Sequence, residues 1–118
     1  MKNIHRDNYT NLVLYIQEVY SADVELVDFT NKRIKGQIDY DTRLIQINKN
    51  MSFRFAYMIL AHELGHLVSR NKLQKINFED EYTTDEREDL AFKYGWYFCQ
   101  KYSCNLITKK DWIYLHGK

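Results

Sequence analysis

Two spacings of apolar residues divide the chain into helical and extended segments. At the start of the chain, apolar side chains recur every three or four residues, which predicts an amphipathic helix over residues 8–20 with Asp7 or Asn8 as its N-cap. Beyond this helix, apolar residues alternate with polar ones, as they do in strands with one buried face. Three such runs predict three short strands, at residues 24–29, 33–40 and 43–48.

The helix predicted over residues 52–69 is apolar on most of its circumference, with Ser52 as the expected N-cap. A helix of this kind is typical of the centre of a domain rather than of its surface. Its polar residues include His62, Glu63 and His66. Because a buried polar group without a partner is costly, we expect these three side chains to share a partner.

Two further helices are predicted after a polar loop over residues 70–82. Thr83 and Glu86 have the spacing of a capping box, so a long helix is expected to begin there. A short helix with Thr108 as its cap is expected over residues 108–115. The predicted fold is therefore α+β, with a small three-stranded sheet, antiparallel or mixed, beside a buried helix and flanked by helices at both ends of the chain.

Composition and charge exclude several classes of function. The 118 residues fit one small domain, placed over residues 1–118, and the net charge of +1 gives no reason to expect binding to nucleic acid or to a membrane. No apolar run approaches the roughly 20 residues that span a bilayer, and the first residues lack the apolar core of a signal peptide. We therefore expect a soluble cytoplasmic protein in which Cys99 and Cys104 are reduced thiols.

The segment His62-Glu63-Leu64-Gly65-His66 has the spacing of a zinc-binding helix. His62 and His66 lie one turn apart, so their imidazoles point the same way and can bind one Zn²⁺ ion. Glu63 lies about 100° further round the helix, where it cannot join them as a ligand but can reach a water molecule at the ion. The motif therefore predicts two metal ligands and a catalytic base, the layout of a zinc hydrolase.

A catalytic zinc site needs a third protein ligand, which this motif does not contain. The extended metzincin motif would place Gly at position 69 and His at position 72, whereas the chain has Ser69 and Lys72, so that class is excluded. The acidic start of the next predicted helix is the obvious source, and we choose Glu88 there. The neighbouring acidic residues that stay open as alternatives are Asp85, Glu86 and Asp89.

Small residues around Glu88 support this choice. Ala91 and Gly95 follow Glu88 by three and seven residues, on the same face of the predicted helix. Gly65 offers a matching bare patch beside His62 on the zinc-binding helix. Small side chains on both helices allow the close approach that three converging ligands require.

The motif and the helix after it resemble the ImmA/IrrE family of metallopeptidases. That family pairs a His-Glu-Leu-Gly-His type of motif with a downstream glutamate in a helix like residues 88–95, and the strand ending in Ile45-Gln46-Ile47-Asn48 also matches. The resemblance covers about residues 36–98. Two departures are Phe92, at a position where the family often has Asn or Asp, and the absence of proline from the whole chain.

The resemblance implies a minimal zincin-like fold in which His62, His66 and Glu88 bind Zn²⁺ and Glu63 is the catalytic base of an endopeptidase. Members of the family are similar to anti-repressors of phages and mobile elements, which cleave a helix-turn-helix repressor. Such a repressor is therefore the expected partner and substrate. Two alternatives stay open: a non-cleaving anti-repressor or binding module on the same fold, and a zinc hydrolase with another substrate.

Two features of the expected active site have more than one interpretation. The oxyanion donor is expected among Tyr82, Tyr94, Tyr97 and His116. Packing is the commoner role of a tyrosine, and His116 is expected to be exposed to solvent. The strand over residues 43–48 is either an internal strand or the sheet edge along which an extended peptide would bind.

Overall fold

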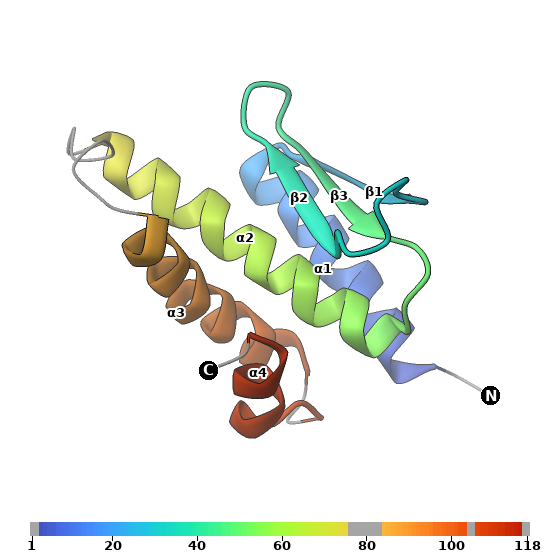
Figure 1. The fold of residues 1–118 in the computed structure, drawn as a ribbon. Coiled ribbons are helices and arrows are strands. Elements are labelled where there is room, and N and C mark those ends of the chain that lie inside the picture. Colours follow the sequence, from blue (N-terminus) through green and yellow to red (C-terminus); the bar gives the residue numbers. More distant parts are fainter. Residues whose placement is uncertain (1–2, 76–83, 104–105, 117–118) are drawn as a thin grey trace.

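The computed structural model describes residues 3–75, 84–103 and 106–116, without the side chains of residues 72–75 and 84–85, and confirms the α+β fold. The elements run in the order α1 (Ile4–Tyr20), β1 (Asp23–Val27), β2 (Gly36–Asp39), β3 (Leu44–Asn48), α2 (Phe53–Lys75), α3 (Thr84–Ser103) and α4 (Lys109–Leu115). Helix α2 crosses the middle of the molecule, with the sheet and α1 on one side and α3 and α4 on the other (Figure 1). Within the described parts, none of the helices has the length and apolar character of a membrane span.

The sheet is mixed, and its strand order is β1-β3-β2. Strand β3 pairs with β1 in parallel and with β2 in the antiparallel sense. Two of its side chains, Ile45 and Ile47, are fully buried. The prediction that this strand forms the sheet edge is therefore wrong, and the alternative of an internal strand is right. Alternation along a strand shows which face is buried but not which neighbours it pairs with. The edges of this sheet are β1 and β2.

Helix α2 is buried as its apolar circumference predicts. Leu60 and Leu64 are fully inaccessible, and Leu67 is nearly so. The backbone N–H of Phe55 donates to the Ser52 hydroxyl over 3.3 Å, which confirms the expected N-cap. The helix continues past the predicted end at residue 69 to Lys75, so the predicted loop begins later than expected. Residues 76–82 of the predicted loop, and Thr83 of the predicted capping box, lie outside the described residues.

The N-terminal helix begins earlier than predicted. The side chain of Asn3, not Asp7 or Asn8, is the N-cap, and it accepts hydrogen bonds from the backbone N–H groups of His5 and Arg6. Asn8 is itself buried inside the helix. The sequence offers several residues with capping side chains in a row, and the choice among them depends on where the apolar face first meets α2.

Helices α2 and α3 approach almost to backbone contact. A Cβ atom on Gly65 would overlap the carbonyl oxygen of Ala91 and would lie 2.8 Å from the Gly95 nitrogen. A Cβ atom on Gly95 would lie 2.9 Å from the Ala61 carbonyl oxygen and 3.1 Å from the His62 Cα. The small residues on the two helices therefore face one another as predicted, beside the first histidine of the motif.

Helix α4 is fixed against the start of α2. Its predicted cap is confirmed, because Thr108 and Asp111 form a reciprocal capping box. The Arg54 guanidinium bonds the Asp111 carboxylate over 2.7 Å, and the Trp112 side chain is fully buried. These contacts hold the last described turn of the chain next to the motif helix. In α3, Cys99 is a buried free thiol, as expected, and Cys104 lies outside the described residues.

Candidate metal centre

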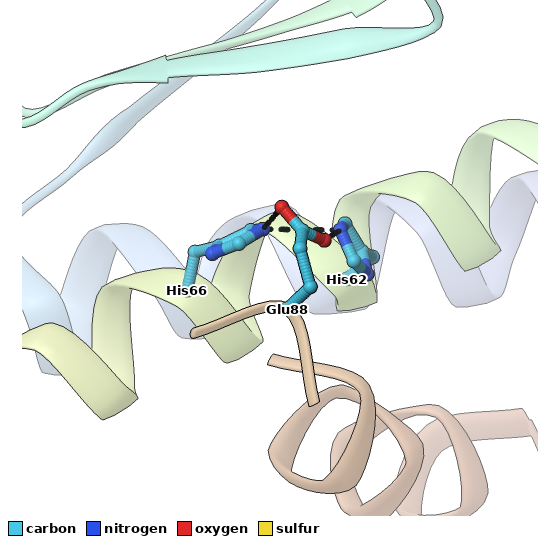
Figure 2. Close-up of side chains that lie close together, drawn as sticks. All are labelled: His62, His66 and Glu88. Atoms are coloured by element: carbon cyan, nitrogen blue, oxygen red, sulfur yellow. Dashed lines mark hydrogen bonds and ion pairs between the residues drawn. The ribbon is translucent and has the colours of Figure 1, made fainter. Parts of the chain in front are cut away.

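Two imidazoles and one carboxylate converge between α2 and α3. The Nε2 atoms of His62 and His66 lie 3.1 Å apart, one helical turn from each other. Glu88 extends from α3 toward both rings, with one carboxylate oxygen 3.3 Å from His62 Nε2 and the other 3.2 Å from His66 Nε2 (Figure 2). The three potential ligand atoms all lie within 4.8 Å of one another, so the group could hold a metal ion.

The close approach of α2 and α3 explains why Glu88 is the acidic residue that reaches the two histidines. Gly95 packs against the backbone of His62, and Glu88 lies two turns before it on the same face of α3. Among the described side chains, Glu88 is the one acidic residue close enough to His62 and His66 to share a metal ion with them. Glu86 and Asp89 are not part of this cluster. The side chain of Asp85, the third alternative, lies outside the described residues.

The electrostatics of the histidines suit a metal ligand. Both imidazoles are largely shielded, with side-chain exposures of 15% for His62 and 16% for His66. Burial lowers the pKa of His66, although the charge of Glu88 and its hydrogen bond act in the opposite direction. A lowered pKa favours the neutral ring, which is the form that binds metals. Two imidazoles and a carboxylate form a donor set that fits Zn²⁺.

Glu63 is a buried carboxyl group next to this cluster. Its residue is only 7% exposed, and burial raises its pKa to about 8, with a further contribution from the negative charge of Glu88. A nearby positive charge would oppose both effects and lower the pKa of Glu63, because opposite charge favours the ionised carboxylate. The two acidic groups and the two imidazoles therefore form a site that is electrostatically suited to a bound cation.

A cleft of about 470 Å³ opens beside the cluster. One wall is the segment that leads into the edge strand β2, and the other is built from α2, α3 and the end of α4. The residues that line the cleft are Arg33, Ile34, Lys35, Gly36, Ile59, His62, Glu63, Glu88, Leu115 and His116. The potential ligands and the buried Glu63 thus face a space into which another molecule can enter.

His116 does not occupy the solvent-exposed position that we expected. It is half-buried, its Nε2 lies 2.8 Å from His62 Nδ1, and its Nδ1 lies 2.7 Å from the carbonyl oxygen of Trp112. The signal in the sequence is its spacing, since it follows the buried Trp112 by one helical turn. Sequence reasoning missed the contact because it depends on how α4 packs against α2.

The other candidates for the oxyanion donor are not part of the cleft wall. Tyr94 and Tyr97 do not line the cleft, and Tyr97 is 57% exposed. Tyr82 lies outside the described residues. Of the three candidates that the structure describes, His116 alone is placed beside the cluster.

Comparisons with known proteins give a match in fold. No protein-family model matches the chain. A search of curated proteins also finds no match. Among solved structures, the chain is similar to a Mycobacterium tuberculosis transcriptional regulator, with a TM-score of 0.58 and 14% sequence identity over 80% of this chain. The chain spans 29% of the length of that regulator, and at this identity the likeness concerns the fold alone.

Proposed function

We propose that the protein is a zinc-dependent endopeptidase of the ImmA/IrrE type. The observation that carries the proposal is the convergence of His62, His66 and Glu88 beside the buried Glu63, at one end of an open cleft. His62, His66 and Glu88 are the proposed ligands, and Glu63 is the proposed catalytic base. This is the arrangement of two ligands, a base and a downstream glutamate that the resemblance to the family implies.

In the proposed hydrolysis of a peptide, Glu63 transfers protons while His62, His66 and Glu88 hold the metal ion. When bound, a zinc ion makes a water molecule more acidic and polarises the carbonyl group of the substrate. Glu63 accepts the proton of the attacking water and then gives it to the leaving amine. Its shielded position keeps the proton away from bulk solvent. Ile59, Leu115 and His116 line the same cleft, where they would contact a bound substrate.

An extended peptide would bind along the edge strand β2. The segment 33–36 lines the cleft and continues into β2, whose partner β3 occupies one side only. A sheet edge of this kind binds a peptide by main-chain hydrogen bonds. The edge available to a peptide is therefore β2 and not β3, the strand that the sequence had suggested. A peptide bound along β2 would lie close to Glu63, which lines the same cleft. This favours a peptide over a non-peptide substrate.

The proposed substrate is a helix-turn-helix transcriptional repressor of a phage or mobile element, in the cytoplasm. The resemblance to ImmA/IrrE proteins supports it. A non-cleaving anti-repressor is the competing function. The burial of Glu63 supports cleavage, since a carboxyl group with a raised pKa lowers the stability of the fold as pH rises from about 4.5 to about 8, a cost that a catalytic base would explain.

The test is to incubate the zinc-loaded protein with a helix-turn-helix repressor, chosen from those encoded beside its gene where one is present. Wild-type protein is expected to give two repressor fragments by mass spectrometry, and Glu63→Gln is expected to give none while it still binds zinc. Full relief of repression by Glu63→Gln, with an intact repressor, would establish the non-cleaving function instead.

A further inference from the structure

Two successive hydrogen bonds connect α4 to the candidate metal centre through the His116 ring. The carbonyl oxygen of Trp112 lies 2.7 Å from His116 Nδ1, and His116 Nε2 lies 2.8 Å from His62 Nδ1. The opposite nitrogen of the His62 ring, Nε2, is the one that faces His66 and Glu88. Both ring nitrogens of His62 therefore have defined neighbours. The chain of contacts ends at the carbonyl oxygen of Trp112, which can only accept a hydrogen bond.

The Trp112 carbonyl oxygen favours one arrangement of the protons on the His116 and His62 rings. A carbonyl oxygen only accepts hydrogen bonds, so His116 Nδ1 must carry a proton and donate it to Trp112. A neutral His116 then has a bare Nε2, which can only accept. The second hydrogen bond therefore requires the His62 proton on Nδ1. This arrangement competes with the one in which His62 Nε2–H donates to the Glu88 carboxylate, 3.3 Å away. A neutral His62 ring protonated at Nδ1 has its lone pair at Nε2, on the side of the cluster.

We propose that His116 is a positioning residue that holds His62 in the tautomer with a bare Nε2, ready to bind a metal ion. The inference rests on the proposed metal-binding function of His62, His66 and Glu88. Metal-binding histidines commonly donate their second N–H group to an outer partner, which fixes the tautomer and the ring orientation. Here that partner is a second imidazole, itself fixed by a main-chain carbonyl group.

The surroundings of His116 hold its ring in this orientation. Its ring centroid lies 4.2 Å from that of Trp112 and 5.0 Å from that of Phe92. Trp112 is fully buried, so the carbonyl group that orients His116 belongs to an anchored turn of α4. Phe92 stands where the ImmA/IrrE family often has Asn or Asp, and it contributes here to an aromatic wall around His116.

The tautomer can be measured without metal or substrate. In metal-free wild-type protein at a pH of about 8, where imidazoles are neutral, ¹H–¹⁵N correlation spectra of the histidine rings distinguish Nδ1–H from Nε2–H. The expected result is an Nδ1–H tautomer for both His62 and His116. An Nε2–H tautomer for His62 would overturn the proposal, whatever the metal affinity.

Variants of His116 test the consequence for zinc binding. His116→Phe keeps a ring of similar size but can neither donate nor accept, and zinc affinity by chelator competition is expected to fall roughly 10- to 100-fold. His116→Gln has both a donor and an acceptor and is expected to recover most of this loss. Thermal unfolding of the metal-free variants establishes that each one folds. If His116→Phe does not fold, the His62 tautomer in the wild type decides the question.

The outcomes separate this inference from the proposed function. A His116→Phe variant that folds and binds zinc as tightly as the wild type would overturn the role of His116 while the metal centre stands. Equal losses in His116→Phe and His116→Gln would show that a hydrogen-bonding side chain at position 116 does not restore zinc binding, and would also overturn it. A wild-type protein that binds no zinc would overturn the proposed function, and the tautomers would still be decided by the spectra.

Discussion

At the scale of single residues, His62, His66 and Glu88 form the candidate metal centre, and His116 contacts His62 from the end of α4. The helical spacing of His62 and His66 fixes their common direction, and the structure brings them together with Glu88. Glu88 could be chosen from the sequence because small residues mark the face of close approach. The contact of His116 with His62 could not be predicted, because it joins residues 54 positions apart through the packing of a separate helix.

The buried carboxyl group of Glu63 predicts an unusual dependence of stability on pH. Its pKa is about 8 in the folded protein against an ordinary value of 4.5 in the unfolded chain. Between these values the folded state binds more protons, so the free energy of unfolding of metal-free protein falls as pH rises from about 4.5 to about 8. The loss is on the order of a few kcal/mol, at roughly 1.4 kcal/mol per pKa unit.

Glu63→Gln removes this titration, so its free energy of unfolding is expected to lack the corresponding fall. Urea denaturation of both proteins over this pH range, with a chelator present, gives the comparison. Curves that run parallel between wild type and variant would contradict the burial of a titrating Glu63.

Glu88 is expected to contribute more to zinc binding than any neighbouring acidic residue. Glu88→Ala removes one of three proposed ligands, so its zinc affinity is expected to fall by more than the roughly 10- to 100-fold typical of an outer partner. Asp89→Ala is the matched control, one position further along α3, and its affinity is expected to be unchanged. Competition with a chelator measures both. An unchanged affinity in Glu88→Ala, or a larger loss in Asp89→Ala, would assign the third ligand elsewhere.

At the scale of elements, periodicity predicted the helices and strands, whereas boundaries and strand order depended on distant contacts. The start of α1 at Ile4 and the end of α2 at Lys75 both lie beyond the apolar stripes that predicted these helices. In α2, the last described turns are stabilised by Arg70, whose guanidinium lies 4.0 Å from the centre of the Tyr40 ring. The central position of β3 follows from its pairing with two strands, which no local pattern records.

The close packing of α2 on α3 predicts an unusual effect of Gly65→Ala. In an ordinary helix this change stabilises by roughly 0.5–1 kcal/mol, because alanine favours the helical conformation. Here the new Cβ would overlap the Ala91 carbonyl oxygen, so the variant is expected to lose about 1–3 kcal/mol of stability. The displacement of α3 would also weaken zinc binding.

Chemical denaturation measures the stability of Gly65→Ala, with the exposed Lys93→Ala on α3 as a control that is expected to change little. A Gly65→Ala protein that is more stable than the wild type would show that the two helices lie further apart than described.

At the scale of the whole molecule, the candidate metal centre joins elements that are distant in the sequence. Its proposed ligands come from α2 and α3, and its outer partner His116 follows α4. Sequence reasoning could predict that a metal would join two helices. It could not predict that α4 would close the same site, because the capping box and the Arg54–Asp111 ion pair that position α4 act through the folded arrangement.

Zinc is therefore expected to stabilise the whole fold. Binding to the folded state alone adds about 2.7 kcal/mol when free zinc exceeds its dissociation constant 100-fold. The unfolding temperature of the wild type is expected to rise with zinc and to return to its metal-free value with a chelator. His66→Ala, which lacks one proposed ligand, is expected to show little of this rise. An equal rise in both proteins would place the bound zinc at another site.

The central claim is that His62, His66 and Glu88 form a metal centre, and zinc-edge anomalous diffraction from crystals of the zinc-loaded protein tests it most directly. We predict a strong anomalous peak bonded by Nε2 of His62, Nε2 of His66 and the carboxylate of Glu88, with the Glu63 carboxylate beside it but not bonded to it. The absence of a peak between these three side chains, or a peak bonded through His62 Nδ1, would contradict the account.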